Sequence, residues 1–220
     1  MLHESILKFL KELDRNNNKA WFDEHRNRYE NARTEFIAFI GTLIKEIGSF
    51  EKQIGGFTAK DCIFRINRDV RFSKDKRPYK NNFAGYFNHQ GKNGTGAGYY
   101  IHIQPGKCML AGGIWMPEAP VLAKIRQEID YNFDEWKKII GKPGFRKLFP
   151  NGIESNQLLT RPPKGYDQDN PALDYLKMKN FFISKPFSDK EALSKGFEKE
   201  VAKHYKMMKP VIDFMNRSLE

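Results

Sequence analysis

The sequence predicts an α+β fold in a single domain, with N-terminal helices, a central and mainly antiparallel sheet, and C-terminal helices. Three observations lead to this prediction. Apolar residues recur at three- and four-residue steps through the first fifty residues, which is the spacing of a buried helical face. The period changes to two from Asp61, and two further strand-like segments flank Pro105-Gly106. Helical spacing returns after Met116.

Length and composition agree with one globular domain over residues 1–220. The chain is 40% hydrophobic and 14% aromatic, with 18 phenylalanines, so we expect an aromatic-rich core. Cys62 and Cys108 have no C-x-x-C partner, which argues against a disulfide framework or a zinc site. The N-terminus lacks the apolar block of a signal peptide, and no run is long enough to span a bilayer. We therefore expect a cytoplasmic protein.

The N-terminal helices are predicted from their apolar faces and their caps. The first helix presents one apolar side, made by Ile6, Leu7, Phe9, Leu10 and Leu13. Arg15 and the asparagines that follow end it, and Asn18 is placed to cap a second helix that begins near Lys19. The apolar stripe then continues to Ile47, with a break expected near Asn27.

The predicted sheet begins at Asp61, where residues 61–67 alternate as a strand does. A second strand is expected from Phe83 to Phe87. Residues 99–104 and 107–114 are predicted to form an antiparallel hairpin, because Pro105 and Gly106 suit the two central positions of a type II turn. In that register the side chain of His102 lies on one face with those of Tyr100 and Gln104.

The remaining elements are mainly helical. Met116-Pro117-Glu118 is predicted to start a helix, and residues 141–171 are rich in Gly and Pro and read as surface connections. We expect a short helix from Asn170 to Lys177 and one more strand at 181–183. Ser188 and Glu191 form a capping box, and a C-terminal helix follows that is kinked or divided at Pro210.

The charge of the chain is concentrated in one segment. The net charge is +11 for the whole sequence and +5 for residues 65–80 alone, where seven basic residues meet only two aspartates. Six of the seven recur at every third position, a period that matches neither an α-helix nor a strand. We therefore expect a folded loop in which only some of these side chains converge. The nearly neutral N-terminal helices argue against a cationic membrane-surface helix.

Three interpretations of this segment stay open. Arginine forks suit phosphate, so the first is an anion site whose ligand is a nucleotide, a phosphometabolite or a nucleic acid, bound by Arg65, Arg68, Arg71 and Lys76. The second is a small-molecule enzyme, with Asp69, His102 or Tyr79 as acid or base. The third is an internal network of arginines and aspartates that fixes the loop and binds nothing.

Other motifs carry less information. The glycine-rich residues 91–98 run into a strand, whereas phosphate-binding loops run into a helix. No nucleophile elbow, zinc-protease helix or paired-carboxylate metal motif is present, so the sequence predicts no metal and no cofactor. It does not predict an enzymatic activity or an oligomeric state.

The charged segment also carries a family resemblance. The run from Arg65 to Tyr79 resembles, at every defining position, the motif R-x-x-R-D-x-R-F-x-x-D-K-x-P-Y of a widespread bacterial family of unknown function, which has related segments in fungal proteins. Residues 16–22 and 112–117 are similar to that family as well. The resemblance implies a single intracellular α+β domain, and it carries no established activity.

Overall fold

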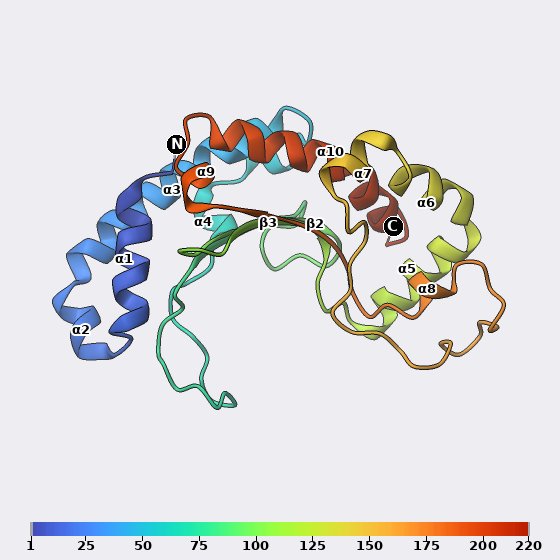
Figure 1. Cartoon of the computed structure of the whole chain (residues 1–220), viewed down its shortest axis with the longest axis horizontal. Helices are drawn as coiled ribbons and strands as arrows, with labels where there is room; N and C mark the ends of the chain where they lie inside the picture. The colour runs from blue at the N-terminus through green and yellow to red at the C-terminus, as the bar shows by residue number, and fades with distance from the viewer. Residues whose placement is uncertain (1, 220) are drawn as a thin grey trace. The chain divides into compact units, whose positions relative to one another are not determined.

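The computed structural model describes residues 2–219 and has an α+β architecture, as the sequence predicts. The chain divides into two compact units, which are described separately (Figure 1). The first unit comprises residues 1–92, 100–110 and 186–203, and the second comprises residues 93–99, 111–185 and 204–220. The prediction of a single domain over residues 1–220 stays a prediction.

A four-stranded antiparallel sheet has the strand order β1-β2-β3-β4, with β1 at Phe83–Phe87, β2 at Gly98–Ile103, β3 at Cys108–Ile114 and β4 at Phe181–Phe187. The predicted turn between β2 and β3 is confirmed. The Lys107 N–H donates to the Gln104 carbonyl at 2.9 Å, and Gly106 has φ of +71°, which the second central position of a type II turn requires.

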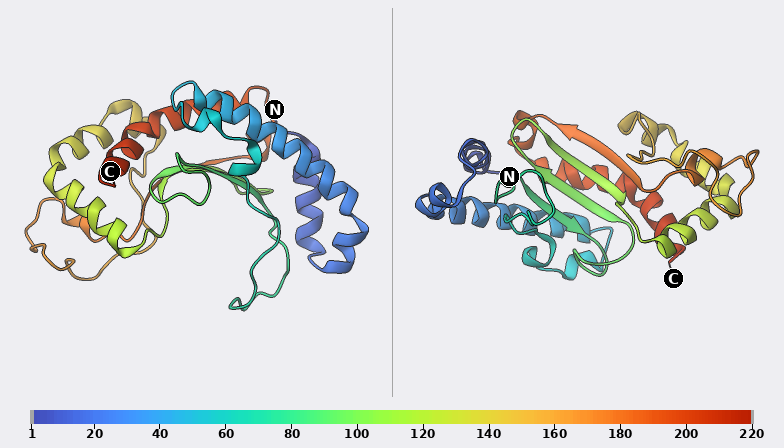
Figure 2. Two further views of the ribbon diagram at one scale, coloured as in Figure 1. Left: turned by 180° about the vertical axis from the view of Figure 1, so that it is seen from behind. Right: turned by 90° about the horizontal axis from the view of Figure 1, so that it is seen from below.

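In the first unit, helix α3 (Arg26–Gly48) packs against one face of β1 (Figure 2). Gly85 permits this close approach, because a Cβ atom there would lie 3.2 Å from the Ile40 side chain of α3. Phe83 stacks on Phe36 of α3 at a ring distance of 5.2 Å. The first turn of α10 (Phe197–Arg217) joins the same layer, since Phe197 stacks on Phe39 at 6.0 Å.

Three consecutive asparagines join α1 (Glu4–Arg15) to α2 (Lys19–Glu24), and each has a different role. Asn16 ends α1 and donates its amide to the Glu12 carbonyl. Asn18 caps α2 by accepting from the Trp21 N–H, as predicted. Asn17 projects away from both helices to the backbone of Tyr79. The break in the helical stripe falls at His25, two residues before the predicted position.

The strand predicted over residues 61–67 is wrong. A capping box of Thr58 and Asp61 instead makes a short helix, α4 (Ala59–Cys62). Beyond Cys62 the chain is extended, and it pairs only through isolated antiparallel bridges, Ile63 with Gly85 and Asn67 with Tyr79. The apolar alternation is therefore real, but it belongs to an irregular segment beside β1.

In the second unit, the backbones of β3 and β4 approach closely at Gly113. A Cβ atom at Gly113 would lie 2.2 Å from the Phe181 carbonyl oxygen, and its φ of +137° favours glycine. The helices of this unit are α5 (Ala119–Tyr131), α6 (Phe133–Ile140), α7 (Pro143–Leu148), α8 (Leu173–Leu176) and the part of α10 from His204 onward. Helix α5 begins two residues after Pro117, with Pro120 in its first turn.

The end of the chain follows the prediction with one difference. Ser188 and Glu191 form the expected capping box at α9 (Asp189–Ala192). The C-terminal helix α10 runs continuously through Pro210 instead of being divided there. No helix within residues 2–219 has the length and apolar character needed to cross a membrane.

Candidate functional site

Residues 65–80 form a hairpin that projects from the first unit beside β1 (Figure 1). Its two arms are paired by backbone hydrogen bonds from the Arg68 N–H to the Pro78 carbonyl, at 2.9 Å, and from the Lys80 N–H to the Ile66 carbonyl, at 2.8 Å. The first arm continues from the extended segment after α4, and the second arm leads into β1. The basic segment is therefore a folded loop, as its three-residue period indicates.

Two copies of an Asp-x-Arg unit shape the tip of this hairpin. The Asp69 carboxylate accepts the Arg71 backbone N–H at 3.2 Å and is paired with the guanidinium of Arg71 at 2.7 Å. The Asp75 carboxylate likewise accepts the Arg77 backbone N–H at 3.0 Å and is paired with the guanidinium of Arg77 at 2.9 Å. In each unit an aspartate turns its own backbone and holds the arginine two residues later.

Arg68 and Lys76 brace the tip from opposite arms. The Arg68 guanidinium is paired with Asp75 at 2.8 Å and also donates to the Arg77 carbonyl at 3.0 Å. The Lys76 ammonium crosses in the other direction and donates to the Val70 carbonyl at 3.0 Å. These contacts use the donor capacity of Arg68 and Lys76 inside the hairpin.

The pKa values of the two aspartates agree with this network. The hydrogen bonds from Arg77, followed by those from Arg68, hold the pKa of Asp75 far below its ordinary range. Hydrogen bonds from Arg71 lower the pKa of Asp69 in the same way. Both carboxylates are solvent-accessible, so they are charged acceptors of the network at neutral pH and poor candidates for a general base.

The hairpin is anchored to α1 and α2 at its base. Asn17 donates to the Tyr79 carbonyl at 2.9 Å and accepts from the Tyr79 N–H at 3.1 Å, as a neighbouring strand would. The Tyr79 ring is 7% exposed and stacks on Phe22 at 4.0 Å. Asp14 adds an ion pair of 3.1 Å to Arg77. Tyr79 therefore has a packing role in this structure.

The side chains of Arg65 and Phe72 make none of the hydrogen bonds or ion pairs that brace the hairpin. Phe72 lies at the tip and is 96% exposed, with the Arg71 guanidinium 5.8 Å from the centre of its ring. Arg65 lies at the base, where its side chain faces a surface pocket. No ion pair within 4.0 Å neutralises Arg65 in the part of the chain that the structure describes.

The pocket beside Arg65 has a volume of about 640 Å³ and is strongly basic. Four cations and one carboxylate line it, together with neutral residues; the lining is Tyr29, Glu30, Arg33, Thr34, Lys60, Ile63, Phe64, Arg65 and Lys92. A fifth cation lies next to it, since the Lys80 ammonium donates to the Arg65 carbonyl at 3.0 Å and sits 5.5 Å from the centre of the Phe64 ring. Burial, and then the charge of Arg65, lowers the pKa of Lys80.

The pocket was not predicted from the sequence. Arg33 comes from α3, Lys60 from α4 and Lys92 from the loop after β1, so only the fold brings them to Arg65. Of the four predicted anion-binding residues, Arg65 lines the pocket, Arg71 lies at the tip, and Arg68 and Lys76 brace the hairpin between them. The four side chains do not form one cluster.

His102 lies on the face of β2 that α3 does not cover, away from the hairpin's network. Its Nδ1 accepts from the Tyr100 hydroxyl at 3.0 Å and from the Asn82 amide at 3.3 Å, and its Nε2 is 2.8 Å from the Gln104 side-chain oxygen. The predicted sharing of one face by Tyr100, His102 and Gln104 is thus confirmed. Burial lowers the pKa of His102 and raises that of Tyr100 to about 12, so both groups are neutral at pH 7.

The two cysteines are buried, and the described residues form no metal-binding cluster. Cys62 and Cys108 are buried free thiols, and burial raises the pKa of each to about 11. Among residues 2–219, no three His, Cys, Asp or Glu side chains gather as a metal site would require.

Comparison with known proteins gives one match. A family model described as a conserved hypothetical protein (DUF2461) matches residues 5–214, which includes the hairpin, the pocket and the sheet. No curated protein and no solved structure is significantly similar to the chain.

Proposed function

The chain belongs to the DUF2461 family of conserved hypothetical proteins, and we propose that it binds a phosphate-bearing ligand at the base of the 65–80 hairpin. The observation that supports this proposal is the basic pocket, in which Arg65 meets Arg33, Lys60 and Lys92 with Glu30 as the one carboxylate of the lining. Cations gathered without matching carboxylates repel one another, and an anion relieves that repulsion.

The chemistry of the pocket suits phosphate in particular. Arg33 and Arg65 offer planar forks that donate two parallel hydrogen bonds to phosphate oxygens, and Lys60 and Lys92 offer mobile point charges. The Lys92 ammonium is already held near the pocket by a 3.0 Å bond to the Lys60 carbonyl. The volume of about 640 Å³ is sufficient for a nucleotide or a phosphorylated metabolite as well as for a short stretch of nucleic acid backbone.

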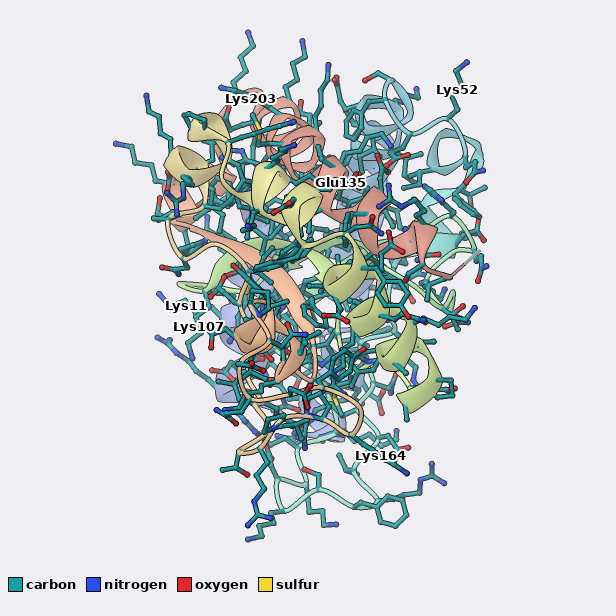
Figure 3. The ribbon with its side chains drawn as sticks, turned by 90° about the vertical axis from the view of Figure 1, so that its right-hand side faces the viewer. Lys11, Lys52, Lys107, Glu135, Lys164 and Lys203 are labelled. Carbon is teal, nitrogen blue, oxygen red and sulfur yellow. The ribbon has the colours of Figure 1, made fainter. Side chains whose placement is uncertain are left out.

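A thermal-unfolding experiment tests the proposal with inorganic pyrophosphate and ATP as probes. A ligand at a hundred times its Kd raises the unfolding free energy by about 2.7 kcal/mol, which is about 5–11 °C in Tm for a chain of this length. We expect stabilisation of the wild type that is lost in Arg65→Ala and Arg33→Ala. Lys164→Ala is the matched control, because Lys164 is an exposed cation of the second unit and lies on a surface loop (Figure 3).

Two outcomes of this experiment would refute phosphate binding at the pocket. If neither probe stabilises the wild type, or if both stabilise Arg65→Ala as much as the wild type, the pocket does not bind phosphate. Equal losses in Arg65→Ala and Lys164→Ala would show that only net charge matters.

A catalytic role is a second proposal, and it rests on His102 alone. Asp69 holds Arg71 and Tyr79 is packed against Phe22, so neither has the free acid or base that the enzyme interpretation needs. His102 is a neutral imidazole on a half-buried face, with Tyr100 and Asn82 both directed at Nδ1. A general base would use that Nδ1 lone pair after Tyr100 rotates away.

A further inference from the structure

The tip of the hairpin exposes a large apolar side chain. Phe72 is 96% exposed, although Lys76 and the Asp69–Arg71 pair contact the two residues just before it. An aromatic ring in solvent adds nothing to the stability of the loop that carries it. The ring is therefore available for contact with another molecule.

The surroundings of Phe72 indicate the class of that molecule. The Arg71 guanidinium lies 5.8 Å from the ring centre, and Lys74 is exposed and has no ion pair in the described part of the chain. The Arg71 guanidinium is paired with Asp69, so Lys74 is the unpaired cation beside the ring. An exposed aromatic face with a guanidinium and a free ammonium beside it is the arrangement that stacks an unpaired base while its phosphates meet the cations. We propose that the hairpin tip binds single-stranded nucleic acid by stacking one base on Phe72.

The same observations disfavour other partners. An anionic membrane needs a broad apolar surface in addition to charge, and Phe72 is the single exposed large apolar side chain among residues 65–80. A protein partner needs an apolar anchor surrounded by residues that exclude water, whereas the neighbours of Phe72 are charged. Duplex nucleic acid offers no free base face unless a base step is first unstacked.

This inference rests on the proposed function, because it names the class of phosphate-bearing ligand that the same hairpin takes. Arg65 and Phe72 are seven residues apart on one arm, which spans at most about 25 Å. A strand of several nucleotides can therefore place phosphates at the basic pocket while one of its bases reaches the tip. A free nucleotide is too short for both contacts.

Fluorescence anisotropy with three 12-nucleotide probes of equal charge tests the inference: oligo-dT, oligo-U, and an abasic DNA strand that has phosphates and no bases. We expect the wild type to bind oligo-dT or oligo-U about fivefold or more tightly than the abasic strand, since a stacked base contributes about 1–3 kcal/mol. Phe72→Ala should reduce the affinity for the base-bearing strand to that for the abasic strand, and Phe72→Trp should retain it. The two base-bearing probes distinguish DNA from RNA.

Two results would overturn the inference. The first is equal affinity of the wild type for the abasic and base-bearing strands. The second is an unchanged affinity in Phe72→Ala, including the case in which that variant instead loses binding to phosphatidylserine vesicles. Because Phe72 is fully exposed, an unchanged Tm in Phe72→Ala is expected and excludes misfolding as the cause of a loss.

The proposed function is tested independently of this inference. It is wrong if neither pyrophosphate nor ATP stabilises the wild type, and that result does not depend on the Phe72 variants. If Phe72→Ala binds oligonucleotides normally while Arg65→Ala loses pyrophosphate, the pocket stands and the stacking inference is wrong.

Discussion

Replacing Asn17 by alanine should destabilise the protein even though Asn17 lies in a connection between helices. The Asn17 side chain is the hydrogen-bonding partner of both backbone groups of Tyr79, at 2.9 and 3.1 Å. Tyr79 itself is 7% exposed and stacked on Phe22, so water has poor access to those groups after the substitution. Asn17→Ala therefore leaves one partly buried N–H and one partly buried carbonyl without a protein partner.

The magnitude follows from the cost of an unpaired buried polar group, which is about 1–3 kcal/mol. The two bonds are partly buried, so we use the lower end for each and expect a loss of about 2 kcal/mol. For a chain of this length that loss lowers Tm by about 4–8 °C. Urea unfolding should show the same loss as a lower midpoint with an unchanged slope.

Asn16→Ala is the matched control, because it removes a neighbouring asparagine whose single hydrogen bond, to the Glu12 carbonyl, is exposed. We expect that variant to lie within about 0.5 kcal/mol of the wild type, as surface substitutions usually do. If Asn17→Ala is no less stable than Asn16→Ala, Asn17 is not the anchor of the hairpin, and Tyr79 is held by stacking alone.

Three further predictions concern titratable groups. Because the pKa of Asp75 is depressed, its pairing with Arg68 stabilises the hairpin from neutral pH down to the ordinary aspartate range, and this stabilisation is lost only as the pH falls below that range. Amide exchange of the hairpin should therefore stay slow from pH 7 to 5, and it should be fast throughout this range in Asp75→Asn. The lowered pKa of His102 means that the neutral imidazole is favoured by folding, so stability should decline as pH falls through about 6.5, and His102→Gln should abolish that decline. Cys62 and Cys108, each with a pKa of about 11, should react with a thiol reagent at pH 8 only after denaturation; rapid reaction of the folded protein would contradict their burial.

The parts of the fold that the sequence predicts are those set by local chemistry. Asn18 caps α2, Pro105-Gly106 makes the predicted turn, and Ser188 and Glu191 form the predicted capping box, because each depends on residues within a few positions. The strand predicted from Asp61 is wrong because a competing local signal prevails. Thr58 and Asp61 have the spacing of a capping box, and that signal starts a helix.

The candidate site is harder to predict because it depends on contacts between distant segments. Arg65 is recognisable in the sequence, but Arg33, Lys60 and Lys92 reach it from three separate elements, and no local pattern links them. A periodicity argument also treats the cations of residues 65–80 as equivalent. It contains no information on which of them will pair with a carboxylate or donate to a backbone carbonyl.

The hairpin engages most of its cations in internal contacts although its net charge stays +5, and this changes what the charge density means. Of its seven cations, three are in ion pairs and two donate to backbone carbonyls, which leaves Arg65 and Lys74.

Each phosphate neutralised on a single strand contributes about −0.7 to the dependence of log K on log salt. If all seven cations met phosphates, the hairpin's share of that slope would be about −5, whereas two free cations give about −1.4. A double variant of Arg65→Ala and Lys74→Ala should therefore make the measured slope shallower by about 1.4, and a much larger change would show that nucleic acid opens the internal network. The ion pairs join the two arms and the tip of the hairpin, which exposes one aromatic ring and leaves the side chains of Arg65 and Lys74 without an ion pair among the described residues.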